Sequence, residues 1–215
     1  MYNKLKCLIK KSPVLHSIFK LTLLQFRQLW SKNKWNSLKH QSVIKIELGS
    51  GPKKGKNGWT TVDIKSSDII CDLRKGIPLP DNSVDQMYSS HLLEHIPYHE
   101  LVTFLFECRR AMKVDGKFFV CVPNFKLYVD AYVKGKLFKN RDCWWKPGLI
   151  YTGSNIDQLN YIAYMKGQHK YMFDEENLIN TLRKAGFSDV KLREFDQELD
   201  HKDRDYESIY ALARK

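Results

Sequence analysis

The first 40 residues of this 215-residue chain contain no aspartate or glutamate, although the chain as a whole has 24 acidic residues. Nine basic side chains lie in that segment: Lys4, Lys6, Lys10, Lys11, Lys20, Arg27, Lys32, Lys34 and Lys39. Most of the net charge of +12 therefore belongs to the N-terminus, and residues 41–215 carry a net charge of only +3. We predict a basic N-terminal arm, residues 1–41, followed by one nearly neutral domain, residues 42–215.

The sequence also lacks the run of about 18 apolar residues that a membrane-spanning helix needs. Its five cysteines are odd in number and never fall in C-x-x-C spacing, which argues against a disulfide framework and against a zinc site. No small-residue cleavage site follows the basic start, so the arm is predicted to be retained. We expect reduced thiols, no metal site and a cytoplasmic protein, with peripheral membrane association through residues 1–40 as a further expectation.

The arm has the pattern of an amphipathic helix. Ser12 and Pro13 resemble a helix start, and an apolar stripe continues from Leu15 to Trp30. Residues 31–41 are polar and basic and are interpreted as a linker. Three roles stay open for the arm: a helix at an anionic membrane surface, a lid packed on the domain, or a clamp for nucleic-acid phosphates, which is the least favoured.

Short apolar runs alternate with helical patterns from residue 42 onward. The expected strands are 43–48, 60–64, 69–72, 83–90, 117–122, 190–195 and 208–213, and the expected helices are 101–112 and 174–185. Alternating strands and helices predict an α/β fold with a mostly parallel sheet and helices on both faces. Residues 125–170 interrupt this alternation with many aromatic side chains and no clean period.

A glycine-containing turn follows the first expected strand. Glycines at 49 and 51 would let a ligand approach the backbone at the carboxyl end of that strand, where open α/β sheets bind ligands. Pro52 follows directly and a third glycine is missing, so the dinucleotide-binding fingerprint is not met. Asp63, at the end of the second strand, has the chemistry to accept hydrogen bonds from ribose hydroxyls.

Four segments in order, ELGSGP, GWTTVDI, CDLRKGIPLPDNSVDQMYSSHLLEHI and ECRRAMKVDGKFFVCVPN, resemble the class I S-adenosylmethionine-dependent methyltransferases. The type 11 group is the most similar, including small bacterial members associated with cell-surface glycan synthesis. The resemblance implies a Rossmann-like, seven-stranded sheet with an antiparallel C-terminal strand, S-adenosylmethionine as the cofactor, and O-methylation of a saccharide or another small polar acceptor, with or without phosphate.

The resemblance also implies roles at matching positions. Glu47, Gly49, Ser50 and Gly51 would hold the methionine portion of the cofactor, and Asp63 its ribose hydroxyls. Asp72 and Leu73 would flank the adenine, and Ser90 would lie beside the sulfonium.

A hydroxyl acceptor must lose a proton, which a histidine near neutral pH can accept. His95, His91 and His169 are the candidates, in that order; each has the alternative role of a structural imidazole bonded to a carbonyl.

The aromatic segment 125–170 lies where this fold carries acceptor-binding insertions. Trp144, Trp145 and Tyr128 are expected to contact the acceptor, with nearby lysines and arginines suited to an anion; a helical cap with its own aromatic core is the alternative. An RNA methyltransferase that uses the basic arm and a non-catalytic, membrane-recruited module are the other functions considered. Strand 83–90 ends in SSHLLEH and not in the Asn/Asp-Pro-Pro-aromatic motif of enzymes that methylate amino groups of nucleic acids, so a nucleic-acid partner is not expected. The sequence leaves the oligomeric state open.

Overall fold

The computed structural model describes residue 27, residues 29–138 and residues 152–215. A seven-stranded sheet in the order β3-β2-β1-β4-β5-β7-β6 forms its centre. The strands are β1 (Lys45–Leu48), β2 (Trp59–Asp63), β3 (Ile69–Ile70), β4 (Val84–Ser90), β5 (Met112–Pro123), β6 (Ser188–Leu192) and β7 (Ser208–Arg214). Strands β1 to β5 pair in parallel, and β7 is antiparallel to both β5 and β6. The expected fold class, with its antiparallel C-terminal strand, is confirmed.

Helices surround this sheet. They are η1 (Leu73–Lys75), η2 (Leu93–His95), α3 (Tyr98–Ala111), α4 (Phe125–Val133), α5 (Ile156–Tyr164), η4 (Met165–Gly167), α6 (Glu175–Lys184) and η5 (Lys202–Glu207), in addition to a helix at residues 29–38. The apolar side chains of α3 recur at helical spacing and are fully buried against the sheet, as Leu101, Leu105 and Cys108 illustrate. Burial of that face is what holds α3 in place.

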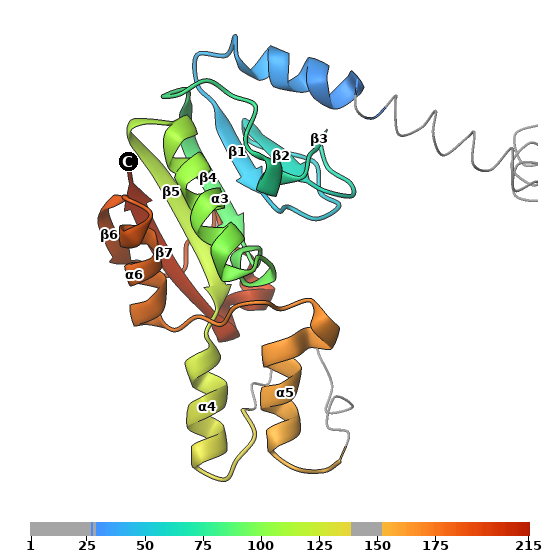
Figure 1. Ribbon diagram of the computed structural model, residues 1–215, viewed down its shortest axis with the longest axis vertical. Helices are drawn as coiled ribbons and strands as arrows, with labels where there is room; N and C mark the ends of the chain where they lie inside the picture. Colours follow the sequence, from blue (N-terminus) through green and yellow to red (C-terminus); the bar gives the residue numbers. More distant parts are fainter. Residues whose placement is uncertain (1–26, 28, 139–151) are drawn as a thin grey trace, which may run out of the picture.

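Helices α4 and α5 project from the edge of the sheet where the parallel strands end (Figure 1). Both belong to the segment 125–170, in which the sequence showed no period. Asn124 caps α4 by accepting a hydrogen bond from the Lys126 amide at 3.1 Å. The two helices pack against each other, and this places part of the aromatic segment below the sheet.

Two expectations about local structure were wrong. Residues 31–41 are not a linker over most of their length, because the helix at 29–38 buries Trp35 and Leu38 in the core with exposed fractions of 5% and 2%. These two residues and Ser31 share one helical face, a short pattern that the surrounding lysines obscured. The strand expected at 117–122 begins at Met112, and Asp115 and Gly116 lie inside it, where its register with β4 shifts.

No helix in the described part of the chain is long and apolar enough to cross a membrane.

Candidate active site

A pocket of about 1030 Å³ lies at the carboxyl ends of β1, β2 and β4. Connections that return from the far end of the chain complete its wall. Its lining residues are Glu47, Gly49, Ser50, Gly51, Pro52, Lys53, Asp63, Ile64, Lys65, Ser66, Ser90, His91, Leu92, His95, Gly167, Gln168, Lys170, His201, Asp203 and Arg204. The volume is ample for a drug-sized ligand. This is the sheet edge at which open α/β folds bind ligands.

The turn after β1 forms the floor of this pocket. Gly49 and Gly51 have φ values of +68° and +67°, which side chains other than glycine rarely adopt. A Cβ on Gly49 would come within 2.6 Å of Leu92, whereas a Cβ on Gly51 would meet nothing within 4 Å. Gly49 is thus required by packing, and Gly51 leaves open space on the pocket side.

Asp63 ends β2 and ties the turn to the next connection. Its Oδ2 accepts a hydrogen bond from the Gly51 amide at 3.0 Å, and its Oδ1 accepts one from the Lys65 amide at 2.9 Å. Each carboxylate oxygen has lone pairs beyond these two bonds. The backbone therefore fixes the carboxylate at the pocket wall while leaving it able to accept hydrogen bonds from a ligand.

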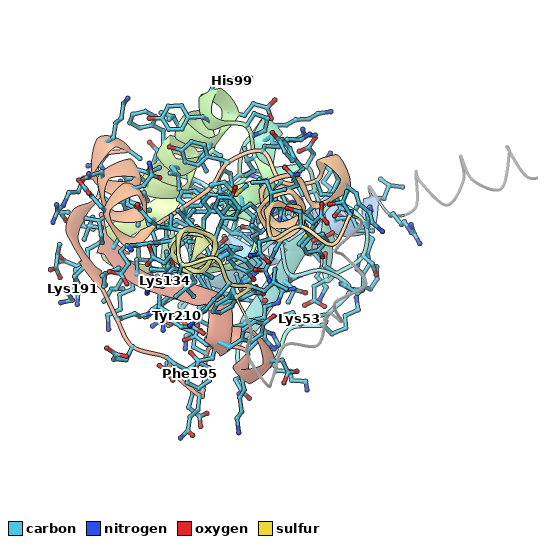
Figure 2. The ribbon with its side chains drawn as sticks, turned by 90° about the horizontal axis from the view of Figure 1, so that it is seen from below. Lys53, His99, Lys134, Lys191, Phe195 and Tyr210 are labelled. Atoms are coloured by element: carbon cyan, nitrogen blue, oxygen red, sulfur yellow. The ribbon has the colours of Figure 1, made fainter. Side chains whose placement is uncertain are left out.

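The Glu47 carboxylate forms an ion pair with a lysine side chain of the same turn. The Lys53 ammonium lies 2.5 Å from Glu47 Oε1 and 2.8 Å from His201 Nε2. Because an ammonium only donates, His201 must accept through Nε2 and is the Nδ1–H tautomer. The contact demonstrates that a positively charged amino group fits against Glu47 inside the pocket. Lys53 is labelled in Figure 2, which views the molecule from the end where α4 and α5 project.

His91 follows Ser90 directly and has a strained backbone, with φ at +51°. Its amide donates to the Cys121 carbonyl at 2.9 Å, and its Nε2 lies 2.9 Å from Ser208 Oγ. Burial lowers the pKa of His91 well below its ordinary value, with further lowering from Arg204. The imidazole is therefore neutral near pH 7 and held in one orientation.

His95 and His169 lie edge to face, with ring centres 5.0 Å apart. His95 lines the pocket and its side chain is 34% exposed, whereas His169 is buried and does not reach the pocket wall. Burial lowers the pKa of both imidazoles, more than their hydrogen bonds to carbonyls raise it. Between His91 and His95 in the sequence, Glu94 is fully buried, and burial raises its pKa to about 8.

Most of the predicted site residues meet in this pocket: Glu47, Gly49, Ser50, Gly51, Asp63, Ser90, His91 and His95 all line it. Besides His169, three others do not. Asp72 is engaged by Arg74 through contacts of 3.0 Å, Leu73 belongs to the core, and Tyr128 is buried with its hydroxyl bonded to Glu207. Trp144 and Trp145 lie outside the described residues.

Several of the lining residues were not predicted from the sequence. Lys53 is the exception, because it lies just beyond the glycine turn that follows Glu47, and its position there could have predicted the ion pair with Glu47. Lys170, His201 and Arg204 come from connections far along the chain. No local pattern marks them, because only the fold brings those connections over the strand ends.

The comparisons with known proteins agree with this architecture. A family model described as a methyltransferase domain matches residues 43–120, less than half of the chain. A methyltransferase from Haloferax volcanii, solved with the Trm112 methyltransferase activator, has a TM-score of 0.50 at 13% identity, over 90% of this chain and 91% of that chain.

Two further solved structures are similar at slightly lower scores. The SAM-dependent methyltransferase from Archaeoglobus fulgidus has a TM-score of 0.49 at 17% identity, over 88% of this chain and 94% of that one. The corresponding protein from Mesorhizobium loti has a TM-score of 0.48 at 16% identity, over 85% and 97%. Identities this low indicate a common fold and nothing narrower. No curated protein matches the sequence.

The family match covers β1 to most of β5, and this stretch supplies the glycine turn, Asp63, Ser90, His91 and His95. Residues 43–120 of this chain therefore match a methyltransferase domain.

Proposed function

We propose that this protein transfers the methyl group of S-adenosylmethionine to a hydroxyl oxygen of a small polar acceptor, a saccharide or another metabolite that carries phosphate. One observation supports this most strongly. A single pocket is lined by the glycine turn and Asp63 and also by His91, His95, Lys170 and Arg204. Such a pocket has room for a cofactor and an acceptor side by side.

The residues of the glycine turn, together with Glu47 and Asp63, fit the cofactor. The Lys53 ammonium on Glu47 stands in for the amino group of the methionine portion. The open space at Gly51 allows close approach to the backbone, and Asp63 can accept hydrogen bonds from two ribose hydroxyls. The cofactor supplies an electrophilic methyl group on a sulfonium; the chain's own residues must hold the acceptor in line with it.

Other lining residues suit a polar or anionic acceptor. Lys170 and Arg204 line the pocket together with His91 and His95. Lysine and arginine side chains bind phosphate oxygens strongly. Helices α4 and α5 lie below this edge of the sheet, and we assign the segment 125–170, including Trp144, Trp145 and Tyr128, to framing the acceptor (Figure 1).

The acceptor hydroxyl must lose its proton during transfer. His91 and His95 are the two candidate bases that line the pocket, while the buried position of His169 makes it the weakest of the three candidates. A well-placed general base contributes about 10² to 10⁴-fold to such a step. Replacing the catalytic histidine by asparagine should therefore lower turnover on that scale while leaving cofactor binding intact.

The test is a screen of nucleotide sugars and phosphorylated sugars with cofactor labelled in its methyl group. We expect label to appear on an oxygen of one of these compounds, and we expect the Asp63→Asn variant, which keeps the shape of the side chain, to bind S-adenosylhomocysteine at least about tenfold more weakly in calorimetry. The Asp115→Asn variant serves as the matched control, because Asp115 is exposed near the start of β5 and does not line the pocket. Absence of S-adenosylhomocysteine binding to the unmodified protein would overturn the proposal. Label on bulk RNA and not on the sugars would redirect the assignment to nucleic acid.

A further inference from the structure

A buried carboxyl group beside the pocket lacks a hydrogen-bond donor. Glu94 is 2% exposed, and within the described part of the chain neither of its carboxyl oxygens has a hydrogen-bond partner. Burying a carboxyl group without a partner costs several kcal/mol, so an orphaned glutamate of this kind requires an explanation. None of the roles assigned above uses it.

The tautomers of the neighbouring histidines are fixed by backbone carbonyls. His95 Nδ1 lies 3.1 Å from the Gln168 carbonyl oxygen, and His169 Nδ1 lies 2.5 Å from the Ile162 carbonyl oxygen. A carbonyl can only accept, so both Nδ1 atoms carry hydrogen and each Nε2 retains a free lone pair. The Nε2 of His95 lies 3.8 Å from Glu94 Oε1.

His91 adds a third lone pair. The Ser208 hydroxyl donates its hydrogen to the Arg204 carbonyl at 2.6 Å, so His91 Nε2 must donate to Ser208. That leaves His91 Nδ1 as an acceptor, 3.7 Å from the same Glu94 oxygen. Lone pairs on neutral imidazoles therefore lie around a buried carboxyl group, which is the kind of ligand arrangement that a bound cation requires.

We propose that Glu94, His95 and His169 bind a divalent transition-metal ion, for which Zn²⁺ has the matching ligand preferences. One ligand atom from each of these residues lies within 4.8 Å of the other two. Two histidines with one glutamate form a known type of ligand set for Zn²⁺. Each histidine already donates its other ring nitrogen to a carbonyl, as metal-binding histidines do to fix their orientation.

The distances leave a small adjustment for binding. Zn²⁺ holds tetrahedral ligand atoms about 3.3 Å apart, since its bonds to nitrogen and oxygen are about 2.1 Å long. From separations of up to 4.8 Å, the side chains must move together by about 1 to 1.5 Å. The backbone of the two segments is held together while the side chains move, because the Glu94 carbonyl accepts hydrogen bonds from the Lys170 and Tyr171 amides at 2.7 and 3.1 Å.

The ion would join two connections that frame the pocket. Glu94 and His95 belong to η2, after β4, and His169 follows η4. Three protein ligands leave a fourth position open, and His95 places the site at the pocket wall. If the proposed function holds, this position is available to an acceptor oxygen, and His91 then remains as the candidate base. Binding of the ion itself does not depend on that function.

The test measures metal binding to the full chain without cofactor or acceptor. After chelator treatment and dialysis, we expect calorimetry with Zn²⁺ to give one tight site per chain, and Co²⁺ to give the visible absorption of a tetrahedral ion. Mg²⁺, which prefers oxygen ligands, should not compete. The Glu94→Gln and His169→Asn variants should lose at least about 100-fold in Zn²⁺ affinity, more than loss of an outer-shell partner costs.

His99→Asn is the matched control, because the His99 side chain is 80% exposed and does not belong to the cluster; it lies at the upper edge of the molecule in Figure 2. Zn²⁺ should raise the melting temperature of the wild type and of this control, but not of the two cluster variants, whose fold is checked by circular dichroism. Equal Zn²⁺ affinity in wild type and both cluster variants would place the ion elsewhere and overturn the proposal. Absence of a stoichiometric site in the wild type would do so as well, and would leave Glu94 as a buried, protonated acid. Methyl transfer is not measured in this experiment, so the proposed function can fail without affecting its outcome.

Discussion

At the scale of single residues, Gly49 and Gly51 share a backbone conformation but differ in what surrounds them. Gly49 faces the Leu92 side chain, and Gly51 faces the open pocket. A Cβ would strain the backbone at both positions by about 1–2 kcal/mol. At Gly49 it would also collide with Leu92, whereas at Gly51 it would occupy space that a ligand needs.

The two alanine variants are therefore expected to fail in different measurements. Gly49→Ala should lower the free energy of unfolding by about 2–4 kcal/mol, because backbone strain and overpacking add. Gly51→Ala should lower it by only about 1–2 kcal/mol but weaken S-adenosylhomocysteine binding more strongly, because the methyl group enters the pocket. Urea denaturation and calorimetry separate the two effects. Equal losses of stability with unchanged affinity in Gly51→Ala would contradict this interpretation of the turn.

The same residues illustrate what the sequence could predict. Gly49, Asp63 and His91 each directly follow or end a strand, so a local pattern was sufficient to place them at the pocket. The cluster of histidines around Glu94 could not be predicted from local patterns. His169 comes close to it only because α5 and η4 turn back toward η2, and cysteine spacing, which argued against a metal site, says nothing about histidines brought together by the fold.

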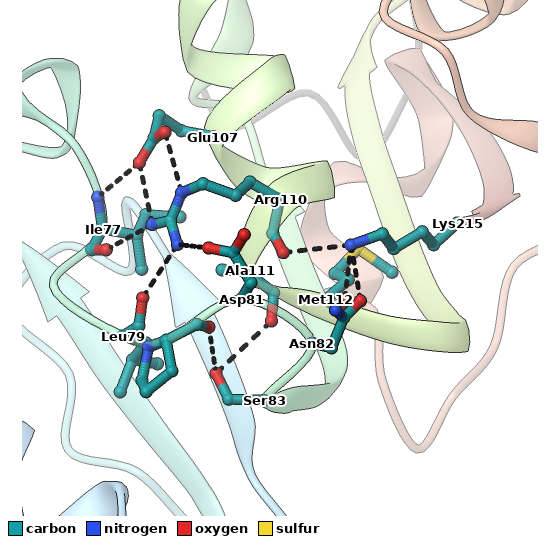
Figure 3. A network of polar contacts seen from close by, with 11 residues as sticks. Ile77, Leu79, Asp81, Asn82, Ser83, Glu107, Arg110, Ala111, Met112 and Lys215 are labelled. Carbon is teal, nitrogen blue, oxygen red and sulfur yellow. Dashed lines mark hydrogen bonds and ion pairs between the residues drawn. The ribbon is translucent and has the colours of Figure 1, made fainter.

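At the scale of elements, Arg110 joins α3 to the connection before β4 (Figure 3). Its guanidinium donates to the carbonyls of Ile77 and Leu79 at 2.9 and 3.0 Å and pairs with Asp81 and Glu107 at 2.6 and 2.9 Å. Hydrogen bonds from Arg110 lower the pKa of Glu107 more than burial raises it, and the Ile77 amide adds a smaller lowering contribution. The network fixes one end of α3 and so supports the strand that carries Ser90 and His91.

A lowered pKa in the folded state means that ionised Glu107 stabilises the fold. This contribution is complete above the unfolded value of 4.5 and is lost as pH falls through the lower folded value. Glu107→Gln should thus be less stable than wild type at pH 7, by about 1 kcal/mol or less because the pair is partly exposed, and the difference should shrink below pH 4.5. Urea denaturation from pH 7 to pH 4 measures it. The exposed Glu198→Gln variant is the control, and a gap that stays constant with pH would refute the assignment.

Element boundaries were predictable where burial follows a regular period, as in β4 and α3. They were not predictable where a short face carries the packing. The helix at 29–38 contributes two large apolar side chains, Trp35 and Leu38, within a basic and polar stretch. Its Ser31 hydroxyl also accepts a hydrogen bond from the Ile70 amide at 2.9 Å, which caps the edge of β3. Residues 31–41 were interpreted as a linker from their composition alone, whereas their tertiary contacts make most of them part of the domain.

At the scale of the whole molecule, the basic segment and the folded domain overlap in the sequence. The basic arm was expected to end at residue 41, yet the core already includes residues of the helix at 29–38. Five of the nine basic residues of the first 40 lie within residues 1–26, which are outside the described part of the chain. Attachment to the domain and attraction to an anionic surface can thus be tested with different truncations.

Removal of residues 1–26 should leave the domain folded, with an unchanged melting temperature and unchanged S-adenosylhomocysteine binding, because the buried contacts of Ser31, Trp35 and Leu38 remain. Removal of residues 1–40 should destabilise it by several kcal/mol, since deleting a buried tryptophan side chain alone costs about 3–5 kcal/mol. Basic residues near an anionic membrane each contribute about 1 kcal/mol, so the shorter truncation should already abolish co-sedimentation of the full chain with phosphatidylserine vesicles. Neutral vesicles provide the control for charge. If the protein without residues 1–26 still sediments with anionic vesicles, the membrane-binding surface lies on the folded domain, and the arm serves only to cover the edge of the sheet.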